Sequence, residues 1–324
     1  MSRLPSELAV SSRSEGQNAF CPLEKPFSLL LVGSGSMACL FAARLAAAGT
    51  SVTLLGSWPE GLAALRRDGV RLLEPDGRER AYPLAVLPCV QAAQPASFTH
   101  AIVLVKSWQT QRATEHLAAV LRPDGLALTL QNGLGNVEIL ASILGSGRVL
   151  QGVTTLGANL LAPGLVQATG EGPVTLGESP RSDEFAAPLQ AAGFEVQTKP
   201  DLAALVWGKL VINAAINPLT ALLGIANGEL LTHHTARKLM PAAVCEAAVV
   251  AAALGIRLPY DNPLATVEAV ARRTAINRSS MLQDVARGAP TEIDAINGAV
   301  VRAGEGAGVL TPVNLSLWQL VKGL

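Results

Sequence analysis

An apolar run from Phe27 to Val32 leads directly into a glycine-containing turn, and an Ala/Leu-rich segment then continues to Gly49. This order predicts a buried strand, a tight turn and a helix. Gly33 permits the turn, Gly35 lets the backbone approach a ligand, and Ala38 allows close helix–strand packing. The helix N-terminus favours an anion. The alternative is a purely structural turn. The segment predicts a dinucleotide site with pyrophosphate contacts from Gly33, Ser34, Gly35, Ser36, Met37 and Ala38.

Strand-like and helix-like segments alternate up to about residue 199, which is typical of a doubly wound parallel α/β sheet. After Pro200 the strand signals stop and only helices are predicted, the first capped by Asp201 and kinked or broken at Pro218. We therefore expect a flexible tail (1–26), a dinucleotide-binding Rossmann domain (27–199) and an all-helical domain (200–324). The predicted strands are 27–32, 51–55, 101–106, 126–130, 149–155, 164–168, 173–177 and 194–197, and the later helices 235–254, 262–275, 291–307 and 312–322.

The composition excludes several classes of function. Net charge is zero, which argues against a nucleic acid or an anionic membrane as the main partner. The four cysteines are scattered and the four histidines form no ligand cluster, so we expect reduced thiols, a cytoplasmic location and no metal site. The longest apolar helix candidate, 244–256, is too short to span a bilayer, which needs about 20 residues. The sequence leaves open whether the protein is a homodimer.

A polar ladder interrupts the apolar segment 205–230, with Lys209, Asn213 and Asn217 each four residues from the next. On a helix this spacing places all three on one face. Buried Lys and Asn side chains cost free energy unless they find partners, so the ladder predicts the wall of a polar cleft. Alternatively, Asn217 satisfies backbone groups freed by Pro218 and Lys209 reaches water.

The end of the second strand bears on the choice of cofactor. Leu54-Leu55-Gly56-Ser57 contains neither the acid that binds a ribose hydroxyl of NAD nor an Arg for the 2′-phosphate of NADP. The missing acid favours NADP mildly, and Ser57 could donate one hydrogen bond to a phosphate.

Two further strand ends carry polar side chains that could reach a ligand. Lys106 could contact cofactor or substrate, or it is a solvated loop residue. Asn132 could bind a ribose or a carbonyl, or it forms an Asn-Gly turn. Near the C-terminus, Thr291 and Asp294 resemble a capping box, and Glu292 would suit a first helical turn.

Together these motifs resemble the ketopantoate reductase (2-dehydropantoate 2-reductase) family. The match covers nearly everything from Phe27 onward, and it is most specific in 209–221 with 227–230, in Asn277 with 279–284, and in 291–298. The resemblance implies an N-terminal Rossmann domain, a C-terminal helical domain and an active site between them. It also implies NADPH-dependent reduction of 2-dehydropantoate to pantoate, a step toward pantothenate and coenzyme A.

The resemblance also implies roles for individual residues. Lys209 falls on the catalytic lysine, whose ammonium stabilises the nascent alkoxide and donates the proton. Glu292 falls at the junction of cofactor and substrate. Asn132 matches a residue near the nicotinamide ribose, and Lys106 and Ala158 match cofactor contacts. The positions that match substrate contacts are Asn213, Asn217, Asn227, Asn277 and Ser280.

One departure from the family concerns the cofactor. Members that use NADPH often carry an Arg where this chain has Ser57, so NADH stays open as an alternative. A reductase of another small 2-oxo acid and a non-enzymatic nucleotide-binding protein are the remaining alternatives. The intact pair Lys209 and Glu292 argues against the last of these, because a binding protein needs no proton donor.

Overall fold

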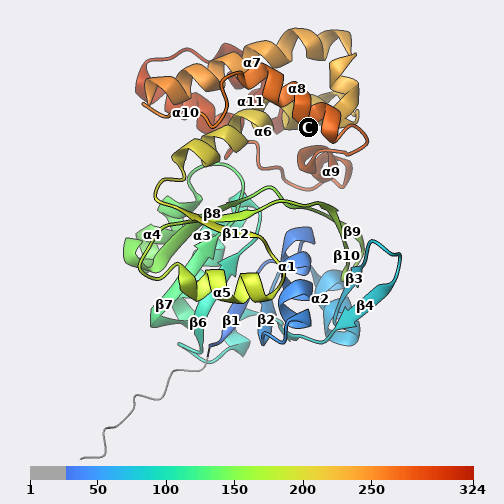
Figure 1. Ribbon diagram of the computed structural model, residues 1–324, viewed down its shortest axis with the longest axis vertical. Helices are drawn as coiled ribbons and strands as arrows, with labels where there is room; N and C mark the ends of the chain where they lie inside the picture. The colour runs from blue at the N-terminus through green and yellow to red at the C-terminus, as the bar shows by residue number, and fades with distance from the viewer. Residues whose placement is uncertain (1–26) are drawn as a thin grey trace, which may run out of the picture.

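The computed structural model describes residues 27–324, and the predicted N-terminal tail (1–26) lies outside the described residues. An eight-stranded sheet forms the centre of the lower part of the molecule, with strand order β12-β11-β8-β7-β6-β1-β2-β5 (Figure 1). Its strands are β1 (Leu29–Val32), β2 (Val52–Leu55), β5 (Ala85–Leu87), β6 (Phe98–Val103), β7 (Leu121–Thr129), β8 (Val149–Thr154), β11 (Val174–Gly177) and β12 (Val196–Lys199).

Six neighbouring strands of this sheet, from β8 to β5, pair in parallel, whereas β11 pairs antiparallel with β8. Alternate residues of β1 serve the two faces. Leu29 and Leu31 pack against α1 (Ser36–Ala47) and α5 (Asp183–Ala191), whereas Leu30 and Val32 pack against α3 (Thr110–Val120) and α4 (Asn136–Leu144). The period of two in a sheet buried on both faces confirms the predicted doubly wound α/β fold.

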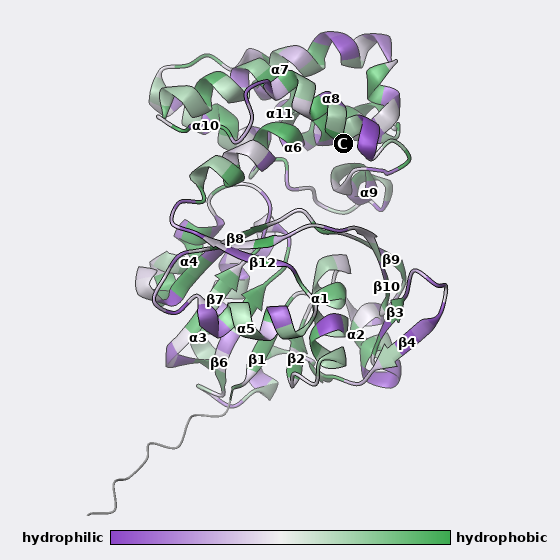
Figure 2. Cartoon of the chain, viewed as in Figure 1, coloured by the Kyte–Doolittle hydropathy of each residue, from purple (hydrophilic) through white to green (hydrophobic). Residues whose placement is uncertain are grey.

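A second, four-stranded sheet packs over α1, in the order β4-β3-β10-β9 (Figure 1). Its strand β4 is the hydrophilic edge visible in Figure 2. The sequence analysis missed β3, β4 and β9; β3 and β4 span only four residues each and include charged residues, so neither forms a continuous apolar run. The bounds are β3 (Val70–Leu73), β4 (Glu79–Tyr82), β9 (Gly157–Ala162) and β10 (Leu165–Gly170), and the helix α2 (Pro59–Asp68) precedes β3.

Helices alone form the part of the chain after β12 that the structure describes. Asp201 was predicted to cap α6, but Leu202 is the N-cap residue; the carboxylate of Asp201, one residue earlier, accepts a hydrogen bond from the N–H of Ala203, the first residue of the helix. In the sequence analysis, α9 was missed, and the helix predicted over 291–307 begins only at Asn297. The helices are α6 (Ala203–Leu223), α7 (His234–Ala253), α8 (Pro263–Arg273), α9 (Ser280–Ala286), α10 (Asn297–Ala307) and α11 (Pro312–Lys322).

The sequence predicted a kink or a break at Pro218; the helix α6 runs unbroken through this residue. Proline has no N–H, so the carbonyl four residues earlier loses its partner within the helix. That carbonyl belongs to Ala214, and the side-chain amide of Asn297 donates to it at 2.9 Å. The partner for the freed backbone group therefore comes from α10, and the ladder residue Asn217 is not needed for it.

Among the described helices, only α6 is long and apolar enough to cross a membrane, and 67% of its most apolar window is buried within the protein. Segment 244–256 was therefore not the longest apolar helix. The buried face of α6 packs against α7 and α11, so α6 is the core helix of the C-terminal part.

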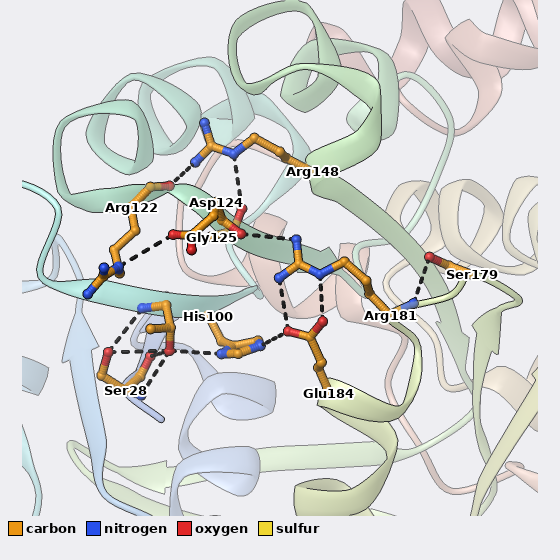
Figure 3. A network of polar contacts seen from close by, with 10 residues as sticks. Ser28, His100, Arg122, Asp124, Gly125, Arg148, Ser179, Arg181 and Glu184 are labelled. Atoms are coloured by element: carbon orange, nitrogen blue, oxygen red, sulfur yellow. Dashed lines mark hydrogen bonds and ion pairs between the residues drawn. The ribbon is translucent and has the colours of Figure 1, made fainter. Parts of the chain in front are cut away.

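A polar network joins several elements at the end of the main sheet where β6 begins (Figure 3). The imidazole of His100 contacts the Glu184 carboxylate at 2.8 Å, and Arg181 binds the same carboxylate through two nitrogens. Arg181 also donates to the carbonyl of Asp124 at 3.0 Å. These contacts connect α5 to β6 and β7 at the amino ends of the parallel strands. Ligands bind at the opposite, carboxyl ends in such folds.

Candidate active site

A cavity of about 1030 Å³ lies between the carboxyl ends of the parallel strands and the helices of the C-terminal part. This volume is at the upper end of ordinary ligand pockets, which suits a dinucleotide together with a small substrate. All but one of the residues predicted to form the site line it. These are Gly33, Ser34, Gly35, Ser36, Met37, Ser57, Lys106, Asn132, Ala158, Lys209, Asn213, Asn217, Asn227, Asn277, Ser280 and Glu292.

The glycine turn after β1 has the backbone that its sequence predicted. Gly33 has φ of 137°, and a Cβ atom there would meet the carbonyl oxygen of Leu104 at 3.0 Å, so a larger residue would be both strained and crowded. Gly35 precedes α1, and no side chain caps that helix. Ala38 is fully buried in the core and does not line the cavity, in keeping with its expected packing role. The free N-terminus of α1 on the cavity wall suits a pyrophosphate.

Lys209 lies in the second turn of α6 with its ammonium on the cavity wall. Its Nζ donates to the carbonyl oxygen of Thr154 at 2.6 Å, which joins α6 to the carboxyl end of β8. Burial lowers the pKa of Lys209 from its ordinary 10.5 to about 8, and the charge of Glu292 partly opposes that shift. An ammonium with a pKa this close to neutrality is a competent general acid.

The carboxylate of Glu292 is a buried contact point between the two parts of the protein. It accepts hydrogen bonds from the N–H of Ser107 at 3.1 Å and from the side chain of Asn132 at 3.4 Å. Lys106 Nζ lies 3.6 Å from the same carboxylate and donates to Asp284 at 2.6 Å. Lys106 is thus not a freely solvated loop residue, and a cross-cleft cluster of opposite charges links the strand ends to the helices.

Glu292 does not stand in a first helical turn, and Thr291 with Asp294 forms no capping box. The helix α10 begins only at Asn297. Residues 292–296 form hydrogen-bonded turns, in which the carbonyl of Glu292 accepts from the N–H groups of Ala295 and Ile296. The expectation was therefore wrong, and the carboxylate of Glu292 is engaged across the cleft.

The amide side chains of the cavity wall are short of partners. In residues 27–324, no hydrogen bond reaches the side chains of Asn213, Asn217 or Asn277, although Asn217 is buried. Asn227 donates to the Thr274 hydroxyl at 2.9 Å, but its buried Oδ1 has no partner. Polar groups in such a position require a ligand or solvent to satisfy them. The ladder therefore lines a polar cleft, as its spacing predicted.

Comparison with known proteins assigns the chain to a family. Residues 29–181 match the model of the ketopantoate reductase PanE/ApbA family, and residues 201–324 match that of its C-terminal part. The chain belongs to the ketopantoate reductase family. The 2-dehydropantoate 2-reductase of Halobacterium salinarum is 36% identical over 300 residues, which cover 91% of this chain and 97% of that protein. Membership makes the protein an oxidoreductase.

Solved structures agree with this assignment. A PanE/ApbA family ketopantoate reductase from Ralstonia eutropha JMP134 superposes with a TM-score of 0.84 at 30% identity, covering 91% of this chain and 97% of that one. D-mandelate dehydrogenase in a ternary structure with NADH and anilino(oxo)acetate superposes with a TM-score of 0.82 at 26% identity, covering 92% and 97%. The same architecture thus occurs in a ketopantoate reductase and in D-mandelate dehydrogenase.

The sequence analysis missed several residues on the wall of this reductase's cavity. It also missed Asp284, the buried partner of Lys106, which does not itself line the cavity; Asp284 lies inside a stretch that carried the resemblance, and only the fold shows its contact. Ser279 has a local role, because it caps α9 by accepting from the N–H of Leu282 and also accepts from the Thr220 hydroxyl. Four more missed residues share one face of a helix, and their helical spacing from Gln109 could have identified them. They are Gln109, Arg112, Ala113 and His116.

Proposed function

We propose that this protein catalyses the reduction of 2-dehydropantoate to pantoate with NADPH as the reductant, in pantothenate and coenzyme A biosynthesis. The observation that carries the proposal is the ammonium of Lys209 on the wall of one cavity, beside amide groups without partners and opposite a glycine turn. A ketone, a carboxylate and a hydroxyl on the substrate would satisfy those amides. The named relatives act on the same acid.

The residues around the cavity fit a dinucleotide. The backbone of 33–37 and the free end of α1 would hold the pyrophosphate, and Ala158 on β9 lies on the same wall. Asn132, oriented by Glu292, would contact the ribose next to the nicotinamide, and Lys106 the cofactor side of the cleft. When bound, a reduced nicotinamide supplies the hydride. Among the described residues of the cavity wall, Glu292 carries the only carboxylate, so no carboxylate at the end of β2 would repel a 2′-phosphate.

In the proposed mechanism, Lys209 acts on the ketone oxygen. As negative charge develops on that oxygen, the ammonium stabilises it and transfers its proton, which leaves a neutral amine and an alcohol. The negative charge of Glu292 raises the pKa of Lys209 against the effect of burial and thereby keeps the donor protonated. Polar side chains from α6, from the segments beside α8 and from the start of α9 would orient the acid. They belong to Asn213, Asn217, Asn227, Asn277 and Ser280.

The test is Lys209→Ala in steady-state kinetics with 2-dehydropantoate and NADPH. Loss of the proton donor should lower kcat about 10²–10⁴-fold. The dissociation constant for NADPH should change little, because the charge of Lys209 matters most in the transition state. Wild-type turnover in this variant would contradict the assigned role, and wild-type protein inactive with NADPH and with NADH would overturn the reaction itself.

A second candidate is the reduction of a different 2-oxo acid, and the likeness to D-mandelate dehydrogenase favours keeping it. Comparing kcat/KM for 2-dehydropantoate, the same acid without its hydroxyl and an aryl 2-oxo acid separates the two. A preference for the hydroxylated acid supports the first proposal, because unpaired amides reject analogues that lack a hydroxyl.

We also propose that residues 27–199 and 200–324 are separate domains of a cytoplasmic enzyme. The last strand ends at Lys199 and the first helix of the C-terminal part begins at Ala203, which supports a boundary between them. The burial of α6, the most apolar long helix, supports a location in water.

A further inference from the structure

The end of β2 has no charged side chain for a cofactor, but another element of the structure contacts it. Ser57 Oγ accepts a hydrogen bond from Gln109 Nε2 at 3.3 Å. Gln109 directly precedes α3, so this contact brings the start of α3 against the end of β2. In a Rossmann fold this corner receives the adenosine half of the cofactor, because ribose recognition occurs at the end of the second strand. Any charge for a 2′-phosphate must therefore come from a neighbouring element.

The helix α3 carries such a charge on the face that starts at Gln109. Arg112, Ala113 and His116 follow Gln109 at three, four and seven positions, the spacing of one helical face, and all four line the cavity. Arg112 is exposed, and within residues 27–324 its guanidinium has neither an ion pair nor a hydrogen bond. Ser57 and Trp58 line the same cavity from the end of β2. The structure thus presents an unpaired guanidinium next to the corner where the family often has its arginine.

The surrounding charges favour an anion at this corner. Burial lowers the pKa of His116, the positive charge of Arg112 lowers it further, and the negative charge of Glu115 acts in the opposite direction. The neighbouring carboxylates of Glu60 and Glu115 belong to α2 and α3 but do not line the cavity. Glu292 lines it and is engaged with Lys106, Ser107 and Asn132.

We propose that Arg112 binds the 2′-phosphate of NADPH and so takes over from α3 the role that an arginine at the end of β2 would have. The inference rests on the proposed function only in assigning this cavity to the nicotinamide cofactor. A planar guanidinium can donate two parallel hydrogen bonds to a phosphate, which a lysine cannot. Arg112 then determines the preference for NADPH over NADH, while Ser57 leaves room for the phosphate.

The experiment measures binding and needs no turnover. Calorimetric titration with adenosine 2′,5′-bisphosphate and with adenosine 5′-monophosphate compares the wild type with Arg112→Gln. One charged hydrogen-bonded contact contributes about 1.5–3 kcal/mol, so the bisphosphate should bind about 10- to 150-fold more weakly to the variant. Binding of the monophosphate should stay within about twofold, since it has no 2′-phosphate. The matched control is Arg272→Gln on α8, an exposed arginine outside the cavity, and it should leave both affinities unchanged.

A second variant keeps the inference falsifiable if Arg112→Gln perturbs the helix. Adding Ser57→Arg to Arg112→Gln returns a guanidinium to the same corner and should restore selective affinity for the bisphosphate. An equal loss of affinity for both probes, or no loss for either, overturns the role of Arg112. Wild-type protein that binds both probes equally well also overturns it. Selective loss without any turnover of 2-dehydropantoate supports Arg112 and instead overturns the proposed substrate.

Discussion

At the scale of single residues, Lys209 combines burial with a cationic charge that the proposed reaction needs. Burial lowers its pKa to about 8, and Glu292 acts in the opposite direction. The ammonium is the proton donor, so reduction requires the protonated form. We expect kcat for ketone reduction to be constant below that pKa and to fall as the pH rises through about 8. The profile of kcat against pH is the measurement.

The variant Glu292→Gln sharpens this prediction. Removing the negative charge removes the influence that raises the pKa of Lys209, so the fall in kcat should begin at a lower pH than in the wild type. Activity will also be lower, since Asn132 and Ser107 lose a charged acceptor. A break that stays in place or moves to higher pH would show that the titrating group is not Lys209.

Asn217 shows what a sequence reveals about a residue and what it does not. The four-residue spacing from Lys209 predicted a shared face, and the cavity wall confirms it. The sequence left open whether Asn217 lines the cleft or binds the backbone carbonyl freed by Pro218. Asn297, which lies far away in the chain, donates to that carbonyl, which belongs to Ala214. Such a choice rests on a tertiary contact, so spacing alone leaves it open.

At the scale of elements, the turn after β7 docks against the turn that carries Glu292. The N–H of Leu134 donates to the carbonyl of Ala295 at 3.0 Å. Gly133 has φ of 81°, and a Cβ atom there would meet that same carbonyl oxygen at 2.4 Å. The close approach of these two segments holds Asn132 against Glu292.

Replacing Gly133 with Ala should therefore separate the two turns. We expect a cost of about 1–3 kcal/mol in backbone strain, together with a raised KM for the cofactor as Asn132 loses its place. The matched control is Gly135→Ala, where φ is 92° but nothing lies within 4 Å. The control should lose stability alone, as measured by urea unfolding. Equal KM values in both variants would contradict a role for the close approach.

Elements with strong local patterns were predicted and those with weak ones were not. The central strands are continuous apolar runs because helices cover both faces, and their positions were correct to within a few residues. Strand β4, Glu-Arg-Ala-Tyr, is largely exposed at a sheet edge, and its pairing with β3 comes from the fold around α1. The short helix α9 begins at Ser280, and only the structure reveals that Ser279 caps it.

At the scale of the whole molecule, chemistry and structural support occupy opposite ends of the parallel strands. The cavity lies at their carboxyl ends, while His100, Glu184 and Arg181 tie the amino ends together (Figure 3). Burial lowers the pKa of His100, the charge of Arg181 adds to this, and Glu184 opposes both. The unfolded chain therefore takes up the proton first, and stability contributed by neutral His100 is lost as the pH falls below about 6.5.

The variant His100→Gln removes this titration without touching the cavity. Its free energy of unfolding should depend less on pH between about 5 and 7 than that of the wild type. Its kcat at neutral pH should match the wild type at a temperature where both are folded. Urea unfolding across that range and one kinetic assay measure both effects, and a reduced kcat would show that the two ends of the strands are coupled.

The polar ladder of α6 also matters before the protein has folded. As it leaves the ribosome, this segment has the length and apolar character of a membrane anchor, and burial in the finished protein gives it no protection yet. A lysine at the centre of such a segment opposes insertion by about 2.5–3.5 kcal/mol; Lys209, one third of the way along, opposes it by up to that amount, and the asparagines add to the penalty. Lys209, Asn213 and Asn217 thus disfavour insertion of the nascent chain into a bilayer as well as lining the cleft, so a leucine in place of each should make the segment a better membrane anchor as well as change its chemistry.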